Sequence, residues 1–175
     1  MKWLIASDIH GSVSCCADLI AAFERERADR LILLGDLFSH GASGSDAEVR
    51  SLLNAKKEKI LCVRGNCDTD GDCAALAFPV AEDCILLPAG GRTVFFTHGH
   101  RRNADRLPPR FSPGDILVSG HTHVPSRSRR GSSVFCNPGS VSLPRGGAPQ
   151  SYMTFDGERF SWKTPDGEEF CSLRL

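Results

Sequence analysis

Carboxylate, imidazole and amide side chains recur in five short glycine-containing segments of this 175-residue chain. Five of its six histidines lie in these segments, a concentration that core packing would not produce. Aspartate oxygen, imidazole nitrogen and amide oxygen suit Mn, Fe or Zn as ligands. One cation rarely needs so many ligands, whereas two cations sharing a carboxylate can clamp the attacking and leaving oxygens of a phosphoryl displacement. The side chains concerned are Asp8, His10, Asp36, Asn66, Asp68, His98, His100, His121 and His123.

Each of these segments directly follows a short apolar run of strand length. The runs are LIAS, LILL, ILCV, TVFF and ILVS. In open α/β sheets the ligand site lies beyond the carboxyl ends of the strands, so the scattered polar residues should converge there. Asp8 and His10 are therefore predicted to be ligands delivered by the first strand of a two-metal site.

The elements between these runs predict an α/β domain. Apolar residues recur at helical spacing over 13–27, with Ser12 or Ser14 as the N-cap, and over 45–57. Strands separated by such helices imply parallel pairing. A hairpin about Gly90 and Gly91, a strand over 133–137 and an antiparallel meander from Tyr152 complete the chain. We expect a single domain, residues 1–175, with an antiparallel tail.

Taken singly, most of these motifs have an ordinary structural interpretation. Asp8 could cap the following helix, Gly35-Asp36 is common turn chemistry, and GNCD could be a β-turn. The segment His121-Thr122-His123 is a stronger signal, because its outer histidines can straddle two metals. Because all five motifs occur at strand ends, one shared metal site is favoured over five unrelated structural roles.

The charge and apolar content of the chain limit the kinds of binding partner that we expect. Lys+Arg and Asp+Glu both number 21, so no general attraction to nucleic acid or to a membrane is expected. No apolar run approaches the roughly 20 residues that span a bilayer, and no signal peptide is visible, so we expect a cytoplasmic protein. The eight cysteines are interpreted as mostly reduced core residues, among them Cys62, Cys84 and Cys136.

The five segments resemble the calcineurin-like metallophosphoesterase superfamily, whose pattern runs D-x-H, G-D, G-N-x-D/E, H and G-H-x-H. GDLFSHG, VRGNCD, FTHGH, SGHTH and FCNPGSVSLPRGG are similar to the small bacterial phosphodiesterases of the YfcE type. The resemblance covers nearly the whole chain. It implies an α/β fold with a two-sheet β-sandwich flanked by helices (four layers) and the metals at one edge.

The resemblance also implies a ligand set and a reaction. Asp8, His10 and His123 would hold one metal, Asn66, His98 and His121 the other, and Asp36 would bridge both. A hydroxide between the metals would attack the phosphorus of a phosphodiester, its pKa lowered by the cations. The expected cofactors are two divalent ions, Mn²⁺ first, with Fe, Zn, Ni or Mg as alternatives.

One departure from the family pattern concerns the general acid. Many members of the superfamily carry histidine after the asparagine, where this chain has Cys67, as in the YfcE-like branch. A thiol substitutes poorly for an imidazolium, so His100 and His40 are further candidates, although His100 could instead orient a ligand. Asp68 could orient Asn66 or cap a short helix.

Arginines cluster after the two histidine segments. Arg101, Arg102, Arg106 and Arg110 follow the first, and Arg127, Arg129 and Arg130 follow the second. Guanidinium groups bind phosphate bidentately, so Arg64, Arg101 and Arg102 are candidate substrate-binding residues for a substrate with more than one anionic group. The alternative is a solvated, charged loop.

Three functions remain open at this point. The first is a two-metal hydrolase of phosphodiesters acting on a small molecule or nucleotide. The second is a phosphomonoesterase or protein phosphatase. The third is a non-catalytic scaffold, similar to the retromer subunit of this fold, although that subunit has lost ligands that this chain retains. Homo-oligomerisation through Leu107 and Phe111 is a further hypothesis.

Overall fold

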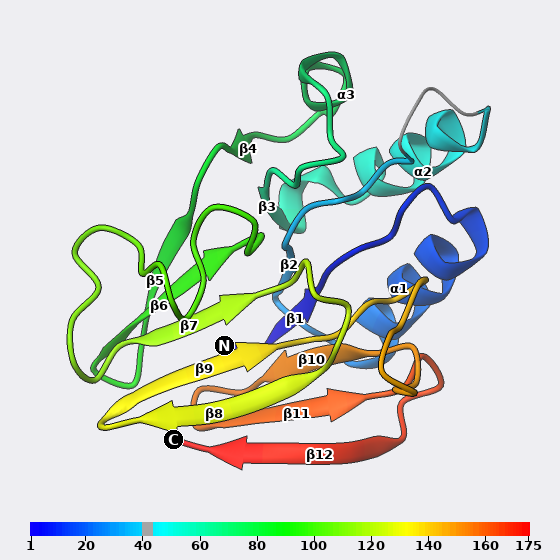
Figure 1. Ribbon diagram of the computed structural model, residues 1–175. Coiled ribbons are helices and arrows are strands. Elements are labelled where there is room, and N and C mark those ends of the chain that lie inside the picture. The colour runs from blue at the N-terminus through cyan, green and yellow to red at the C-terminus, as the bar shows by residue number, and fades with distance from the viewer. Residues whose placement is uncertain (40–43) are drawn as a thin grey trace.

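Two β-sheets lie face to face in the computed structural model, which describes residues 1–39 and 44–175 (Figure 1). His40 therefore lies outside the described residues. The seven-stranded sheet has the order β12-β11-β10-β1-β2-β3-β4. Its strands are β1 Trp3–Ala6, β2 Arg30–Leu33, β3 Ile60–Val63, β4 Val80–Ala81, β10 Tyr152–Phe155, β11 Arg159–Lys163 and β12 Glu169–Arg174.

The second sheet has five strands in the order β5-β6-β7-β9-β8. They are β5 Ile85–Ala89, β6 Arg92–Thr97, β7 Ile116–Ser119, β8 Ser126–Arg130 and β9 Ser133–Asn137. The predicted two-sheet α/β sandwich and its antiparallel tail β10-β11-β12 are confirmed. The hairpin β5-β6 also turns at Gly90 and Gly91, as expected, and both glycines have positive φ.

The central strands of both sheets run parallel. Leu4 pairs with Leu31 and Leu31 with Ile60, so β1, β2 and β3 end at one edge. In the second sheet, β6, β7 and β9 are likewise parallel. Their continuous apolar side chains suit strands that are covered on both faces. This arrangement brings the polar segments after β1, β2, β3, β6 and β7 together.

Helices cover the outer face of the seven-stranded sheet. The helices α1 (Val13–Arg25) and α2 (Gly44–Asn54) lie on that side, away from β5–β9 (Figure 1). Ser12 caps α1, because its side-chain oxygen accepts a hydrogen bond from the Cys15 amide. Two short helices, η1 (Lys57–Lys59) and α3 (Asp70–Ala74), flank β3, and α3 begins with a capping box between Thr69 and Asp72.

Three apolar layers result from this packing. Cys16, Leu19 and Phe23 of α1 pack on one face of the seven-stranded sheet. Between the sheets lies a second layer, which includes Trp3, Ile5, Phe96, Val118 and Trp162. On the outer face of the second sheet, Phe95, Leu117 and Phe135 are covered by Ala104 and Phe111 from the loop after β6. Phe111 is thus engaged within the chain, whereas Leu107 is 42% exposed.

The strand β8 was not predicted, because its sequence SRSRR contains no apolar residue and all five residues are exposed. Its arginines bond across to the neighbouring sheet edge. Arg127 donates to the Ser172 carbonyl and Arg129 to the Arg174 carbonyl of β12. These arginines therefore join the open edges of the two sheets.

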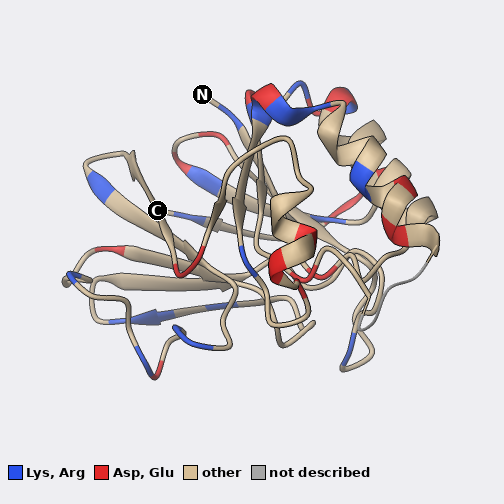
Figure 2. Ribbon diagram, turned by 90° about the horizontal axis from the view of Figure 1, so that it is seen from above, with Lys and Arg blue, Asp and Glu red and all other residues tan. Residues whose placement is uncertain are grey.

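Charges of both signs are interspersed along the chain in Figure 2, on the helices and on the loops of both sheets. No single-sign pole is visible in this view, in agreement with the equal numbers of acidic and basic residues. No disulfide joins any two of the eight cysteines, all of which lie within the described residues. Among the described residues, no helix has the length and apolarity needed to cross a bilayer.

A buried carboxylate at the C-terminal end of α1 ties that helix to both ends of the chain. Glu26 accepts hydrogen bonds from Lys2 (2.6 Å), Lys163 (2.7 Å) and the Tyr152 hydroxyl (3.0 Å). Burial alone would raise the pKa of Glu26, but these three hydrogen bonds outweigh it and lower the pKa to about 2. Glu26 should therefore stabilise the fold in its ionised form.

We expect Glu26→Gln to lower the free energy of unfolding by about 1–2 kcal/mol at neutral pH. Because the folded pKa lies below the ordinary 4.5, the wild-type advantage is fully present above that value and is lost as the pH falls toward 2. Urea unfolding of both metal-free proteins across this range measures the difference. A constant difference at all pH values would contradict the assignment.

Candidate metal centre

The backbone of the predicted ligand segments is tightly turned. Seven non-glycine residues among those described have φ in the left-handed region, which is costly for side chains with a Cβ. Five of the seven are predicted metal ligands: Asp8 (61°), His10 (47°), Asp36 (51°), His121 (69°) and His123 (62°). Such clustering indicates that the surrounding structure holds these residues for a purpose other than stability.

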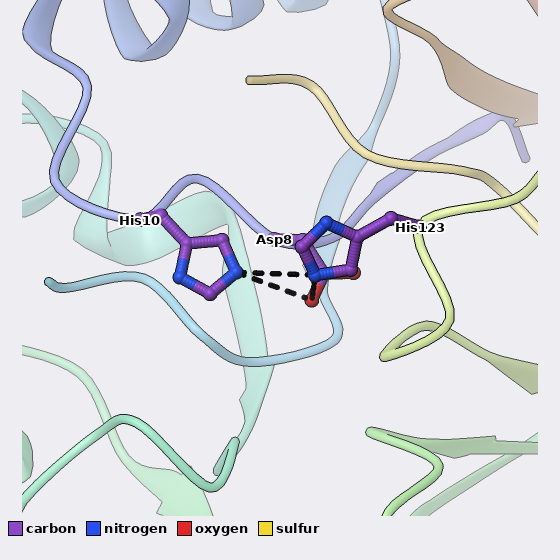
Figure 3. Close-up of side chains that lie close together, drawn as sticks. All are labelled: Asp8, His10 and His123. Atoms are coloured by element: carbon purple, nitrogen blue, oxygen red, sulfur yellow. Dashed lines mark hydrogen bonds and ion pairs between the residues drawn. The ribbon is translucent and has the colours of Figure 1, made fainter. Parts of the chain in front are cut away.

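The first group of ligands joins the end of β1 to the loop after β7. Figure 3 shows the rings of His10 and His123 turned toward the Asp8 carboxylate. His123 Nε2 lies 3.3 Å from Asp8 Oδ1, and His10 Nε2 lies 3.2 Å from His123 Nε2. His10 Nε2 is 3.8 Å from the same Asp8 oxygen. One cation could contact all three atoms.

The second group joins the ends of β2, β3, β6 and β7. His98 Nε2 lies 3.0 Å from Asn66 Oδ1 and 3.2 Å from His121 Nδ1. It is also 3.4 Å from Asp36 Oδ2. Oxygen and nitrogen atoms of four side chains therefore surround a second position.

Asp36 belongs to both groups. Its Oδ2 atom lies 3.4 Å from His98 Nε2 and 3.7 Å from His10 Nε2, so one carboxylate oxygen faces both positions. Its other oxygen accepts a hydrogen bond of 2.8 Å from the Cys67 amide. The structure thus brings all seven predicted ligands together, with Asp36 between the two groups.

The orientation of the imidazole rings fits bound cations. His98 Nδ1 lies 2.7 Å from the Leu34 carbonyl and His123 Nδ1 2.6 Å from the Leu143 carbonyl. A carbonyl oxygen only accepts, so Nδ1 carries the hydrogen and Nε2 of the neutral ring directs its lone pair at a carboxylate. Among the described residues, none donates a hydrogen bond to the buried Asp8 Oδ1, which faces His123. A cation or a proton must therefore lie between these atoms.

The histidines and carboxylates of the site shift one another's pKa values. The adjacent Asp8 carboxylate raises the pKa of His123. Burial lowers the pKa of His98, but the adjacent Asp36 outweighs burial and raises it. Burial raises the pKa of Asp36, and its contacts with His98 and Cys67 reverse this and hold it well below its usual range. Cation binding should therefore release protons from these histidines.

Comparison with known proteins agrees with this geometry. Residues 1–159 match the family model described as the calcineurin-like phosphoesterase superfamily domain. The chain belongs to this superfamily. It is 38% identical over 167 residues to phosphodiesterase YfcE of Escherichia coli K12, covering 92% of this chain and 90% of that protein. The protein is therefore a phosphoesterase with candidate metal-binding groups.

Solved structures of other proteins share the fold of this chain. The structure of YfcE, described as a phosphoesterase from E. coli, superposes with a TM-score of 0.91 at 35% identity and covers 99% of both chains. The structure of Vacuolar Protein Sorting 29 from Cryptosporidium parvum has a TM-score of 0.63 at 18% identity, covering 99% of this chain and 98% of that one. The second likeness concerns the fold alone.

Asp68 of this calcineurin-like phosphoesterase connects two ligand segments. The buried carboxylate accepts hydrogen bonds from the amides of Asp36 (2.9 Å), Leu37 (2.8 Å), Phe38 (3.3 Å) and Gly65 (2.8 Å). It therefore orients Asp36 together with the segment before Asn66, and the cap of the following helix is Thr69 instead. Gly65 is required in this packing, because a Cβ there would lie 2.1 Å from the Asp36 amide nitrogen and from Oδ1.

Two serines that support the site were not predicted. Ser140 and Ser142 both donate side-chain hydrogen bonds to the carbonyl of Asp8, at 2.8 and 2.9 Å. They satisfy the backbone of a ligand residue held at positive φ. The segment FCNPGSVSLPRGG, which resembles the family, contains both serines and was the available signal.

The candidate general acids differ in their surroundings. The Cys67 thiol donates to Asp36 Oδ2 at 3.1 Å, and burial followed by Asp36 raises its pKa to about 12. It therefore remains a protonated thiol bound to Asp36. The His100 ring lies 5.2 Å from that of His98, between ring centroids, and its buried Nδ1 has no partner among the described residues. Burial, followed by the positive charges of His98 and Arg101, lowers the pKa of His100.

The candidate substrate-binding arginines differ in their exposure and in whether they have an acidic partner. Arg64 bonds to Asp70 and Glu82, and Arg102 donates to Asp83 at 3.2 Å. Arg101 is exposed and lines a hollow together with Asn66 and His100. Arg130 is engaged with the loop after β6, through the Ala104 carbonyl and the Asp105 carboxylate.

Proposed function

We propose that this protein hydrolyses phosphodiesters with two divalent cations, Mn²⁺ being the first choice. One cation is held by Asp8, His10 and His123, the other by Asn66, His98 and His121. Asp36 contributes to both positions. The observation that carries the proposal is the placement of Asp36 Oδ2 between the histidines of the two groups. Nitrogen and oxygen donors of this kind also suit Fe, Zn, Ni or Mg.

Bound cations would supply an activated water molecule and neutralise charge on the phosphate oxygens. Other residues of the chain hold the proposed ligands in position. The carbonyls of Leu34 and Leu143 fix the rings of His98 and His123, and Asp68 fixes the segment of Asp36. Asn66, His10 and His121 are not fully buried, so they form the side that a substrate can reach.

The products are a phosphomonoester and an alcohol, and the departing alkoxide needs a hydrogen-bond donor or a proton. We assign the hydrogen bond to the ring N–H of His100, which lines the hollow beside Asn66, and the alkoxide takes its proton from water. Cys67 serves as a donor to Asp36 in this scheme. A diester with a good leaving group needs little further assistance.

Two observations favour catalysis over a scaffold of the same fold. Six of the seven proposed ligands fall in groups that could hold a cation, Asn66 lies 3.0 Å from one of them, His98, and the closely similar YfcE is named a phosphodiesterase. We further propose that residues 1–175 form one catalytic domain, because the layer between the sheets combines Trp3 near one end of the chain with Leu173 near the other.

The proposal is tested with metal-stripped protein and paired chromogenic substrates, bis(p-nitrophenyl) phosphate and p-nitrophenyl phosphate. We expect Mn²⁺ to raise the rate with the diester by at least about a hundredfold, and the monoester to be the poorer substrate. Preference for the monoester would establish the phosphomonoesterase alternative. Folded protein without turnover in the presence of Mn²⁺, Fe²⁺, Zn²⁺, Ni²⁺ or Mg²⁺ would point to the scaffold.

A further inference from the structure

We propose that Arg101 binds a second phosphate group of the substrate, in the hollow beside the metal centre. This inference rests on the proposed function and specifies its substrate class: phosphodiesters that carry an additional phosphomonoester on one arm. Several arginines lie in this region, and they differ in whether they have an acidic partner and in whether they line the hollow.

The hollow adjoins the second metal position and has a volume of about 270 Å³, enough for a phosphate group and several water molecules. Its lining includes a proposed metal ligand, Asn66, so a group in the hollow and a phosphodiester on the metals would be neighbours. The other side chains that line it are Arg64, Asp68, Glu82, His100 and Arg101.

The two nearby arginines are already committed to the protein. Arg64 contacts Asp70 at 2.6 Å and Glu82 at 3.1 Å, and its Nε donates to the Asp68 carbonyl at 3.0 Å. Arg102 donates to Asp83 at 3.2 Å. Each therefore has an acidic partner, and Arg64 shares its single positive charge between Asp70 and Glu82.

Arg101 has no such partner. Within residues 1–39 and 44–175, its guanidinium makes no hydrogen bond and no ion pair, and the residue is exposed. Its side chain lines the hollow together with His100 and Asn66. Arg101 is thus the cation of this hollow whose charge is not offset.

The metal centre and the hollow lined by Arg101 would each bind one phosphate group, which is why we expect a substrate with two. A simple phosphodiester carries one negative charge, which would lie against the two cations. A phosphomonoester elsewhere on the substrate carries about two further charges and would need a cation of its own. The planar guanidinium fork of arginine matches phosphate oxygens bidentately, which lysine does not.

Two matched substrates test the inference. One is the p-nitrophenyl diester of thymidine 5′-monophosphate, and the other is the same diester with a second phosphate on the 3′ oxygen. Both release p-nitrophenol from the same phosphorus. With Mn²⁺, we expect the wild-type protein to prefer the doubly phosphorylated diester in kcat/KM by about ten- to a hundredfold.

Arg101→Gln should remove this preference by raising KM for the doubly phosphorylated diester, so that the two diesters are hydrolysed with similar kcat/KM. Arg101→Lys, which retains the charge but not the fork, should keep part of the preference. Arg106→Gln is the matched control, because Arg106 lies in the same loop and does not line the hollow. This control should behave as wild type.

The outcomes separate this inference from the proposed function. Metal-dependent hydrolysis of both diesters without a preference would overturn the role of Arg101 and leave the proposed function intact. An equal loss with both substrates in Arg101→Gln would also overturn it, because Arg101 would then act on the scissile phosphate or on the fold. If wild-type protein hydrolyses neither diester, the proposed function fails and this inference with it.

Discussion

Asp36→Asn is expected to reduce Mn²⁺-dependent hydrolysis of bis(p-nitrophenyl) phosphate by about a thousandfold or more, the upper end of the loss caused by removing one transition-state contact. Asp36 Oδ2 is the oxygen that faces both groups of ligands. An amide in its place brings no negative charge and can direct an NH₂ group at His98 and His10. The loss should appear in kcat, accompanied by loss of tightly bound metal.

A matched control and a metal count make this result specific. Asp105→Asn changes an exposed aspartate whose partner is Arg130, away from the proposed ligands, and should leave activity unchanged. Metal content after gel filtration should fall from about two ions per chain toward one in Asp36→Asn. Activity within tenfold of wild type, with two ions retained, would show that Asp36 does not link the two positions.

The convergence of the polar segments could be predicted from the sequence because its signals were local. Each ligand segment follows an apolar run, and strands such as Ile60–Val63 and Ile116–Ser119 begin and end where the pattern indicated. Parallel pairing then fixes the common edge on which the segments meet. Residue type supplied the chemistry, since buried histidines and aspartates at strand ends have few structural uses.

Other features had no local signal. The strand β8 forms because its backbone pairs with β9 and its arginines reach β12, and neither contact is visible in the letters SRSRR. Ser140 supports Asp8 across 132 positions of the chain. The arginines looked alike in sequence, but their acidic partners, such as Asp83 for Arg102, distinguish those that are engaged from Arg101.

The residues proposed to hold cations differ from those that hold the ligands in place. Left-handed backbone at Asp8 and Asp36 is unfavourable by itself, so other contacts must maintain it. For Asp8, the supporting contacts come from Ser140 and Ser142. For Asp36, they come from Asp68, which also fixes Gly65 on the neighbouring segment. Asp68 is therefore the residue whose loss should disturb the site without removing a ligand.

We expect Asp68→Asn to lower the free energy of unfolding of the metal-free protein by about 3 kcal/mol. Each Asp68 oxygen accepts two backbone amides, and Asp68 is only 3% exposed. In asparagine one of these oxygens becomes an NH₂ group, so two buried N–H groups lose their acceptor. Urea unfolding should show the loss, and the Mn²⁺ affinity should fall about ten- to a hundredfold.

Asp18→Asn is the control for this experiment, because Asp18 is an exposed aspartate on α1 and should change neither quantity. The two readouts distinguish general destabilisation from misplacement of Asp36. If metal affinity falls while the remaining activity per bound metal is also reduced, Asp68 acts through the position of Asp36. Unchanged unfolding and unchanged affinity would show that the four amides find other acceptors, and that the turned backbone at Asp36 is maintained without Asp68.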